Sequence, residues 1–294
     1  MKRLPERVEI VDVSPRDGLQ MLPHIVPTES KVELIKSLRK AGLKRIEAVS
    51  FVSPKYVPQM ADAGDILAQI GKDENSKTMA LALNERGYKQ AIESEIDWLC
   101  YVIAASETMS KRNANTTIKK SLETTRRAIE FAHEHGVKVR GSIAVSWVCP
   151  DEGDVPKKRV LEITQELFDA GADEVAYNDT VGKANPKDVY ELCSMAKECW
   201  ADKVFAAHFH DTNFTALANI YAAMTAGWDI FDSSVGGLGG CPFSPGASGN
   251  IATEKLVWML SRMGIETGID ENELTHCSEI ALSLENGNPL AMKA

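Results

Sequence analysis

The sequence alternates eight times between a short apolar stretch and a longer segment with helical spacing, and this alternation constrains the fold most. The longer segments, for example residues 28–42 and 155–172, are amphipathic and finish in Ala-Gly, as a helix C-terminus often does. Strict alternation predicts a parallel sheet, and eight units in 294 residues predict a closed (β/α)8 barrel, the TIM-barrel fold. The predicted strands, rich in Val and Ile, are residues 8–13, 45–51, 78–83, 98–104, 137–146, 174–178, 204–209 and 230–235.

A doubly wound open sheet is the alternative fold. Such a sheet more often carries a Gly-rich phosphate loop after its first strand, but residues 14–20, SPRDGLQ, lack the GxGxxG spacing. No low-complexity linker or block of charge marks a second domain, so we expect one catalytic domain over residues 1–294. Within it, residues from about 266 to 294 are expected to form an additional C-terminal helical segment against the barrel.

Composition and charge exclude several classes of partner. The net charge is -9, which disfavours nucleic acid or an anionic membrane surface as a general partner. No apolar run reaches the roughly 18 residues of a transmembrane span, and Pro5 and Glu6 stand where a signal peptide would be apolar. We therefore expect a cytoplasmic protein with reduced cysteines, and the six cysteines form no CxxC pair.

His208 and His210 alternate at the end of the seventh predicted strand, in the segment HFHDTN. Side chains two apart on a strand share a face, with Cα atoms roughly 6.5 Å apart, so the two imidazoles could grip one ion. His133 and His135 have the same spacing, but they end an amphipathic helix, where positions i and i+2 diverge. We interpret that second pair as a solvated helix end.

Further reactive side chains follow the same strand ends, which form the active face of a (β/α)8 barrel. Taken singly, an Asp-Gly after a strand is usually a turn, whereas a carboxylate inside an apolar strand, such as Glu47, is expensive unless it is paired. Arg16 is the partner we expect for Glu47. The side chains predicted to converge on this rim are Arg16, Asp17, Glu47, Asn178, Asp179, His208, His210, Cys241 and Asn250.

Ligand chemistry points to the type of metal. Two imidazoles joined by the hard oxygens of Asp17 and Asn250, with no cysteine pair nearby, suit Mg²⁺, Mn²⁺ or a similar octahedral divalent ion better than a structural zinc. Such a site leaves positions open for substrate or water.

Residues 236–250, GGLGGCPFSPGASGN, hold six of the twenty glycines of the chain. A flexible surface loop is one interpretation. Two prolines, a central cysteine and the position after the last strand favour the other, a lid that closes over substrate. Cys241 would then act as a proton carrier or a nucleophile, and the carrier is favoured because no separate triad is evident.

Long motifs in a fixed order resemble the hydroxymethylglutaryl-CoA lyase family of divalent-metal barrels, which cleave carbon-carbon bonds. The resemblance covers most of the chain, and its motifs are SPRDGLQ (14–20), IEAVSFVSPKYVPQMAD (46–62), ASETMSKRNANTTI (105–118), VRGSIAVSWVCPDEG (139–153), NDTVGKANP (178–186), HFHDT (208–212) and GLGGCPFSPGASGNIATE (237–254). It implies that Asp17, His208 and His210 bind the metal, with Asn250 as a supporting ligand.

The resemblance also implies roles for the remaining site residues. Arg16 matches an arginine that steadies the carbonyl or enolate oxygen, and Cys241 matches a loop cysteine involved in proton transfer. Glu47 and Asp179 match acidic residues that organise Arg16 and the site, and Gln20 lies beside them as a substrate-binding candidate. The implied reaction is retro-Claisen cleavage of 3-hydroxy-3-methylglutaryl-CoA to acetyl-CoA and acetoacetate, a step of leucine degradation.

Several positions depart from the family pattern around the acyl pocket, while the metal and proton groups are intact. They are Met21, Asn178, Lys183, Asn213, Phe214 and Phe243. A lyase for another branched 3-hydroxyacyl-CoA, such as citramalyl-CoA, therefore stays open as an alternative. A condensing acyltransferase of the isopropylmalate synthase kind is a further alternative. It is disfavoured because such enzymes usually add a long C-terminal regulatory region, whereas this chain ends soon after the barrel. A non-catalytic barrel is the last alternative, but it would be expected to have a broken ligand set, and here the set is complete.

The sequence says less about the CoA portion and about assembly. Candidate phosphate contacts are Lys55, Lys111 and Arg112, on loops after the second and fourth predicted strands, although exposed lysines are mostly solvated. The family resemblance suggests a homodimer.

Overall fold

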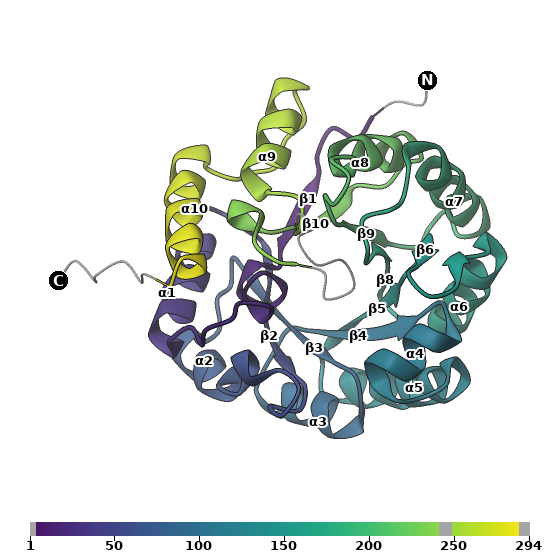
Figure 1. Ribbon diagram of the computed structural model, residues 1–294, viewed down its shortest axis with the longest axis horizontal. Helices are drawn as coiled ribbons and strands as arrows, with labels where there is room; N and C mark the ends of the chain where they lie inside the picture. Colours follow the sequence, from purple (N-terminus) through teal and green to yellow (C-terminus); the bar gives the residue numbers. More distant parts are fainter. Residues whose placement is uncertain (1–3, 241–248, 288–294) are drawn as a thin grey trace.

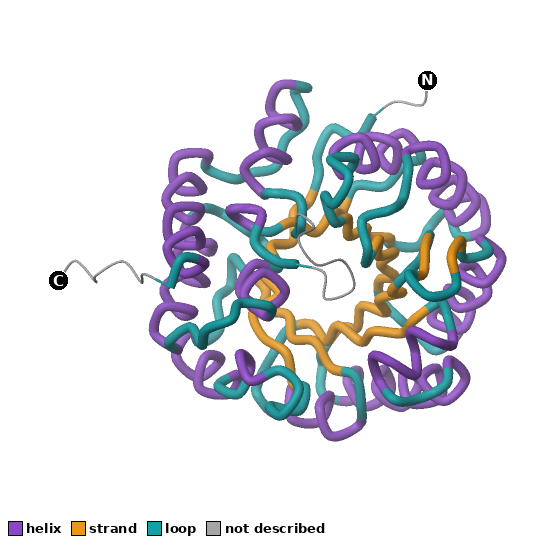
Figure 2. The backbone as a smooth tube through the Cα atoms, viewed as in Figure 1, coloured by secondary structure: helices purple, strands orange, loops and turns teal. Residues whose placement is uncertain are grey.

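The computed structural model describes residues 4–240 and 249–287, and its centre is a closed barrel of eight parallel strands (Figures 1 and 2). The strands are β1 (Glu9–Asp12), β2 (Arg45–Phe51), β3 (Lys77–Ala82), β4 (Trp98–Ala104), β5 (Lys138–Ala144), β8 (Glu174–Asp179), β9 (Phe205–Phe209) and β10 (Ile230–Ser233). They follow one another around the barrel in chain order, and β1 closes it by pairing with both β10 and β2. The predicted (β/α)8 barrel and its eight strands are thus confirmed.

Helices form a ring outside the strands (Figure 2). The described helices are α1 (Thr28–Lys40), α2 (Ala63–Ile70), α3 (Glu85–Glu93), α4 (Glu107–Ala114), α5 (Ile118–Glu134), α6 (Lys157–Asp169), α7 (Pro186–Cys199), α8 (Ala216–Thr225), α9 (Thr253–Arg262) and α10 (Glu271–Glu285), with short helical turns η1 (Ser14–Gly18), η2 (Pro58–Met60) and η3 (Val235–Gly237). A small antiparallel hairpin, β6 (Val148–Cys149) and β7 (Gly153–Asp154), interrupts the connection from β5 to α6. None of the described helices is both long and apolar enough to cross a membrane.

Polar residues in the sequence define where many of these helices begin. Asn84, Ser106, Thr117, Asn185 and Asp270 each precede a helix, and each side chain accepts a hydrogen bond from a backbone N–H of the first turn. Such a cap satisfies a donor that has no partner within the helix and stabilises it by about 1 kcal/mol. The strand-to-helix boundaries are therefore set locally.

The main core lies between the strands and the helix ring. Tyr177 and Phe205 point outward from β8 and β9, and with Phe168 and Trp228 they form an aromatic cluster in which Phe205 stacks on Trp228 at 4.8 Å between ring centroids. Trp228 also donates from Nε1 to the Cys193 carbonyl at 3.2 Å, so its one polar atom is satisfied. Each such buried side chain contributes roughly 1.5–3 kcal/mol.

The inside of the barrel holds a smaller apolar cluster and a row of charges. The cluster consists of Val11, Val13, Met79, Leu81, Cys100, Ala176, Ala206 and Ile230. We call the row the interior ion-pair chain, and its members, in order of contact, are Glu9, Arg45, Glu174, Arg140 and Asp232. Because unpaired buried charges cost several kcal/mol, this continuous pairing is what allows charged side chains inside the barrel.

The C-terminal helix α10 packs against α1 on the outside of the barrel (Figure 1). Lys40 of α1 contacts Glu273 of α10 at 2.9 Å, and His24 Nε2 lies 2.8 Å from the Leu284 carbonyl. The described part of the segment predicted to be helical, 266–294, therefore contains one long helix. Its assignment to a single domain with the barrel stays a prediction.

Candidate active site and metal centre

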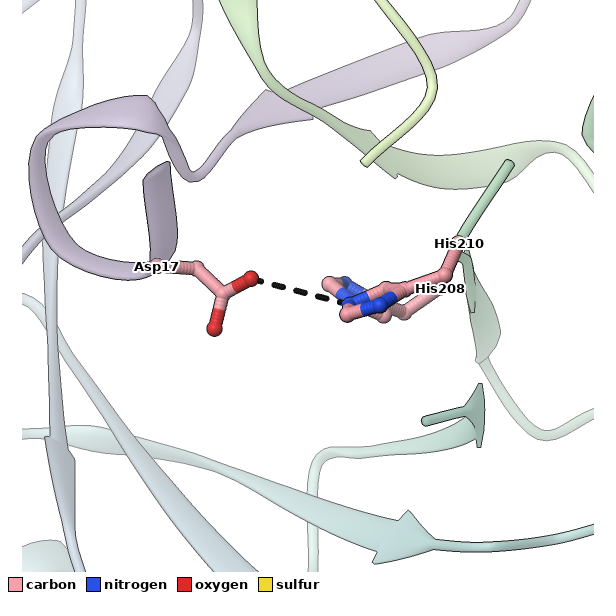
Figure 3. A group of neighbouring side chains, drawn as sticks. All are labelled: Asp17, His208 and His210. Carbon is pink, nitrogen blue, oxygen red and sulfur yellow. Dashed lines mark ion pairs between the residues drawn. The ribbon is translucent and has the colours of Figure 1, made fainter. Parts of the chain in front are cut away.

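Asp17, His208 and His210 meet at the C-terminal end of the barrel strands. Asp17 belongs to η1, directly after β1, and the two histidines lie at the end of β9. One ligand atom from each lies within 4.8 Å of the others, and Figure 3 shows the carboxylate pointing toward both imidazoles. The marked contact joins Asp17 Oδ2 and His210 Nε2 at 3.7 Å. The structure thus brings together the three residues predicted to hold a metal.

Local backbone structure explains how Asp17 reaches the barrel mouth. The turn η1 is a single π-helical turn, in which the amides of Asp17 and Gly18 both donate to the Val13 carbonyl, at 2.7 and 3.2 Å. Such π turns often occur at functional sites. A Cβ on Gly18 would lie 2.9 Å from Leu238 Cβ, so glycine is required for η1 to pack on the segment after β10.

Arg16 keeps the Asp17 carboxylate ionised. Burial by itself would raise the pKa of Asp17, but the Arg16 charge and those of His210 and His208 outweigh it and hold that pKa well below its usual range. Arg16 Nη1 donates to Asp17 Oδ1, which leaves Oδ2 directed toward the histidines. An ionised carboxylate beside two imidazoles is a suitable ligand set for a divalent cation.

Glu47 fixes the other side of Arg16. The register of β2 on β3 shifts between Glu47 and Val49, and the buried Glu47 carboxylate accepts hydrogen bonds from Arg16. Burial opposes the charge of Arg16, but Glu47 and Asp17 raise the pKa of the guanidinium further. The pairing of Arg16 with Glu47 expected from the sequence is found, and Arg16 is a permanent cation held rigidly beside the Asp17 carboxylate.

Asn250 completes the cluster and leaves an oxygen available. It forms an isolated bridge with His210, and its side-chain Nδ2 donates to Asp17 Oδ2 at 2.7 Å and to the Leu238 carbonyl at 3.1 Å. Its Oδ1 and His210 Nδ1 are buried without a hydrogen-bond partner among the described residues. Buried polar atoms are nearly always partnered, so these orphaned atoms next to an ionised carboxylate fit a site for a cation.

Asp232 is a site residue that the sequence reasoning missed. Its Oδ2 lies 3.3 Å from His208 Nδ1, and its Oδ1 accepts from Arg140 Nη1 at 2.7 Å. Burial lowers the pKa of His208, but the hydrogen bond to Asp232 and the Asp17 charge raise it above its ordinary value. For Asp232, burial is outweighed by Arg140 and His208, and the pKa falls to about 2.

Other predicted site residues have a less direct relation to the cluster. Asp179 accepts from the backbone amides of Lys183 and Ala184, both at 3.0 Å, so its described hydrogen bonds organise its own loop and not Arg16. Burial raises the pKa of Asp179 despite these bonds and the nearby histidine charges. Gln20 is half-buried just after η1, and Cys241 lies outside the described residues.

The second histidine pair is the solvated helix end that the sequence predicted. His133 lies in the last turn of α5 and contacts Asp173 at 2.9 Å, with 42% of its side chain exposed. His135 follows the helix and contacts the Phe131 carbonyl at 2.8 Å. Spacing alone therefore does not make a metal site, because the secondary structure decides whether the two rings share a face.

The predicted CoA contacts are exposed, in agreement with the sequence. Arg112 pairs with Asp151 at 3.3 Å, Lys55 lies over the ring of Tyr56, and Lys111 is in α4. None of these contacts bears on phosphate binding, which stays a prediction for all three residues.

A closed parallel barrel with an Asp–His–His cluster at its C-terminal mouth defines a class of barrel enzymes with a candidate divalent-metal site. Residues 7–281 match the family described as HMGL-like. The chain is similar to the mitochondrial hydroxymethylglutaryl-CoA lyase of Arabidopsis thaliana, with 41% identity over 100% of this chain and 62% of that protein, so it spans less than two thirds of that relative.

Two further proteins resemble the chain over nearly their whole length. One is the 3-hydroxy-3-isohexenylglutaryl-CoA/hydroxymethylglutaryl-CoA lyase of Pseudomonas aeruginosa, with 41% identity over 98% of this chain and 97% of that protein. The other is the crystal structure of the HMG-CoA lyase from Brucella melitensis, with a TM-score of 0.93, 40% identity and coverage of 96% and 99% of the two chains. The chain therefore belongs to the HMGL-like family and is an enzyme of the carbon-carbon lyase class.

Proposed function

We propose that the protein cleaves 3-hydroxy-3-methylglutaryl-CoA to acetyl-CoA and acetoacetate and uses Mg²⁺ or Mn²⁺. The observation that carries this proposal is the convergence of Asp17, His208 and His210 with Arg16 held alongside them. The names of the relatives supply the substrate.

The four residues that would hold the ion are Asp17, His208, His210 and Asn250. Imidazole and hard oxygen donors suit Mg²⁺ or Mn²⁺. A bound divalent cation supplies Lewis acidity, which lowers the pKa of a substrate hydroxyl near it.

Arg16 would stabilise the charge that develops during bond cleavage. When the C2–C3 bond of the substrate breaks, its electron pair moves to C2 and the thioester oxygen as an enolate, while the C3 hydroxyl loses its proton and becomes the ketone of acetoacetate. Protonation of C2 then gives acetyl-CoA. Glu47 and Asp17 hold the Arg16 guanidinium in place before the reaction, so little reorganisation is needed as the enolate forms.

Proton transfer involves Cys241 in this proposal. Cys241, His208 and Asp17 are the candidates for removing the first proton, and Cys241 would exchange protons with the substrate or the enolate. We expect Cys241→Ser to reduce turnover by at least about 100-fold and to change Mn²⁺ affinity by less than about twofold. Full activity in this variant would remove Cys241 from the mechanism.

A longer branch at C3 of the substrate is the second candidate, because the name of the Pseudomonas relative includes 3-hydroxy-3-isohexenylglutaryl-CoA. The test is acetyl-CoA release from 3-hydroxy-3-methylglutaryl-CoA, the isohexenyl analogue and citramalyl-CoA, by chelator-treated enzyme with and without Mg²⁺ or Mn²⁺. We expect metal-dependent release, fastest from the methyl substrate. Release that is independent of metal, or a clear preference for another thioester, would contradict the proposal.

The cellular compartment and the oligomeric state of the protein also stay predictions. We expect a cytoplasmic enzyme, from the sequence, and a homodimer, from the family resemblance. Light scattering of the purified protein tests the second expectation.

A further inference from the structure

We propose that Asp232 is a positioning residue that fixes the ring orientation and the tautomer of His208, so that Nε2 of His208 faces the metal. This inference rests on the proposed metal centre. Asp232 lies on β10 and His208 on β9, and the two residues are direct register partners in adjacent strands. The carboxylate and the imidazole therefore project from neighbouring strands into the same part of the barrel.

The contact is buried and directional. Asp232 Oδ2 and His208 Nδ1 are 3.3 Å apart, and the two side chains are only 5% and 7% exposed. A carboxylate accepts hydrogen bonds, so a neutral His208 in this contact carries its proton on Nδ1. The lone pair of Nε2 is then free to bind a cation. Metal-ligating histidines commonly have such an outer partner.

The interior ion-pair chain holds Asp232 in place from behind. Arg140 donates to Asp232 Oδ1 at 2.7 Å and also pairs with Glu174, which accepts from Arg45 at 2.9 Å. Arg45 in turn pairs with Glu9 at 2.8 Å. Asp232 cannot turn away from His208 without breaking its buried ion pair with Arg140, which is costly.

The two histidines are therefore held differently. His210 Nδ1 is buried without a hydrogen-bond partner among the described residues, whereas His208 Nδ1 faces a carboxylate. Figure 3 shows both rings opposite the Asp17 carboxylate, and their centroids are 5.1 Å apart. The ring of His208 is thus oriented before an ion arrives, and we expect the loss of Asp232 to act through that ring.

Mn²⁺ binding to the chelator-treated protein tests the inference, with titration calorimetry or electron paramagnetic resonance as the measurement. Asp232→Asn should weaken Mn²⁺ binding by about 10- to 100-fold. The matched control is Glu174→Gln, which disturbs the same ion-pair chain but leaves the contact between Asp232 and His208, and it should bind Mn²⁺ within about twofold of wild type. Equal losses in both variants, or no loss in Asp232→Asn, would overturn the inference.

A double-mutant cycle separates positioning from a general effect on the fold. In a His208→Ala background, Asp232→Asn should cause no further loss of Mn²⁺ affinity, because its route to the ion has been removed. An additional loss as large as in the wild-type background would show that Asp232 acts by another route. If the wild-type protein does not bind Mn²⁺ at all, the proposed metal centre fails, and this inference fails with it.

The histidine tautomer can also be measured in the wild-type protein, so the test does not depend on the folding of any variant at position 232. Nitrogen-15 spectra of metal-free protein at alkaline pH report which ring nitrogen carries the proton, and His208→Gln identifies the signal by its disappearance. We expect His208 to carry the proton on Nδ1. A proton on Nε2 would contradict the inference even if the metal centre is correct.

Discussion

The two ends of the barrel interior differ in how their buried polar groups are partnered. Toward the N-terminal ends of the strands, Arg45 bridges Glu9 and Glu174 with distances of 2.8 and 2.9 Å. At the C-terminal ends, Asn250 Oδ1 and His210 Nδ1 are buried but lack partners among the described residues. Charges are paired at both ends, but only beside the Asp–His–His cluster do these two polar atoms of the described site remain available where a ligand would bind.

The same division appears in energetic terms. Removing one member of a compensated buried pair leaves an unpaired charge and costs several kcal/mol of stability. Removing an unpartnered polar atom from the C-terminal end of the barrel, here called the open end, takes away a group that contributes little to the fold. We therefore expect changes to the unpartnered groups at the open end to reduce activity more than stability. Changes in the ion-pair chain at the N-terminal end, here called the paired end, should reduce stability more than activity.

The largest effect should come from His210→Ala. Loss of one of three clustered ligands should reduce kcat/KM by more than about 100-fold, since even outer partners of metal ligands cost 10–100-fold when changed. The free energy of unfolding of the metal-free protein, measured with urea, should change by less than about 1 kcal/mol, because His210 Nδ1 has no partner among the described residues and His210 Nε2 contacts Asp17 only at 3.7 Å. A large loss of stability with activity retained would break the comparison.

Arg16→Gln should reduce kcat by about 100- to 1,000-fold, which is the usual cost of removing a preorganised group that stabilises an oxyanion. Mn²⁺ binding should persist, because the ligand atoms remain and Asp17 loses a competing cation. Steady-state kinetics and Mn²⁺ titration measure the two effects separately. Arg16→Lys is the matched control: it keeps the charge but not the planar fork, so its kcat should lie between those of wild type and Arg16→Gln.

Glu174→Gln probes the paired end. Arg45 and Arg140 would each lose one of their two carboxylate partners, and the free energy of unfolding should fall by about 3 kcal/mol. The kcat of the folded enzyme should stay within about twofold of wild type. Urea unfolding and steady-state kinetics on the same preparation test this, and a large drop in kcat without loss of stability would reverse the assignment of the two ends.

Asp12 is a third case in this comparison: it is a buried carboxyl group whose described hydrogen bonds all come from uncharged donors. It accepts from Ser14, from the Val235 amide at 3.1 Å and from Thr253 at 2.7 Å, and burial raises its pKa to about 6 despite these bonds. A carboxyl group whose pKa is higher in the folded state than in the unfolded state stabilises the fold at low pH and loses that contribution as pH rises.

The contribution of Asp12 should therefore fall by about 2 kcal/mol between pH 4 and pH 7. Urea unfolding of wild type and Asp12→Asn across this range isolates it, because the other carboxylates titrate equally in both proteins. The stability of wild type relative to the variant should decline as pH rises. A flat difference would show that the Asp12 pKa is the same in the folded and unfolded states.

Periodicity is sufficient to predict the barrel and its eight strands, because short apolar stretches alternate with longer segments of helical spacing along the chain. Strand ends were harder. The fifth predicted strand extends to residue 146, but β5 ends at Ala144. Val145 has a φ of 53°, which is incompatible with an extended strand. The β6–β7 hairpin was missed because its strands have two residues each, too few for any periodic signal.

Residues of the candidate site could be predicted where a single predicted strand contained the telling pattern. His208 and His210 share a strand, and Glu47 is a conspicuous charge in an apolar strand. The contact between Asp232 and His208 joins different strands, so only the folded register reveals it. The sequence does carry part of the signal: Arg140, Glu174 and Asp232 are charges within predicted strands, as Glu47 is, so the same reasoning marks them as buried charges but does not identify their partners.

The segment that follows β10 is tied down on both sides of residues 241–248. Asn250 Nδ2 donates to the Leu238 carbonyl at 3.1 Å, and the Asp211 amide donates to the Gly249 carbonyl at 2.9 Å. Gly249 must be glycine, because a Cβ there would lie 2.3 Å from the Gly239 carbonyl oxygen. Any larger residue at position 249 would therefore displace the neighbouring Asn250, whose side chain contacts Asp17.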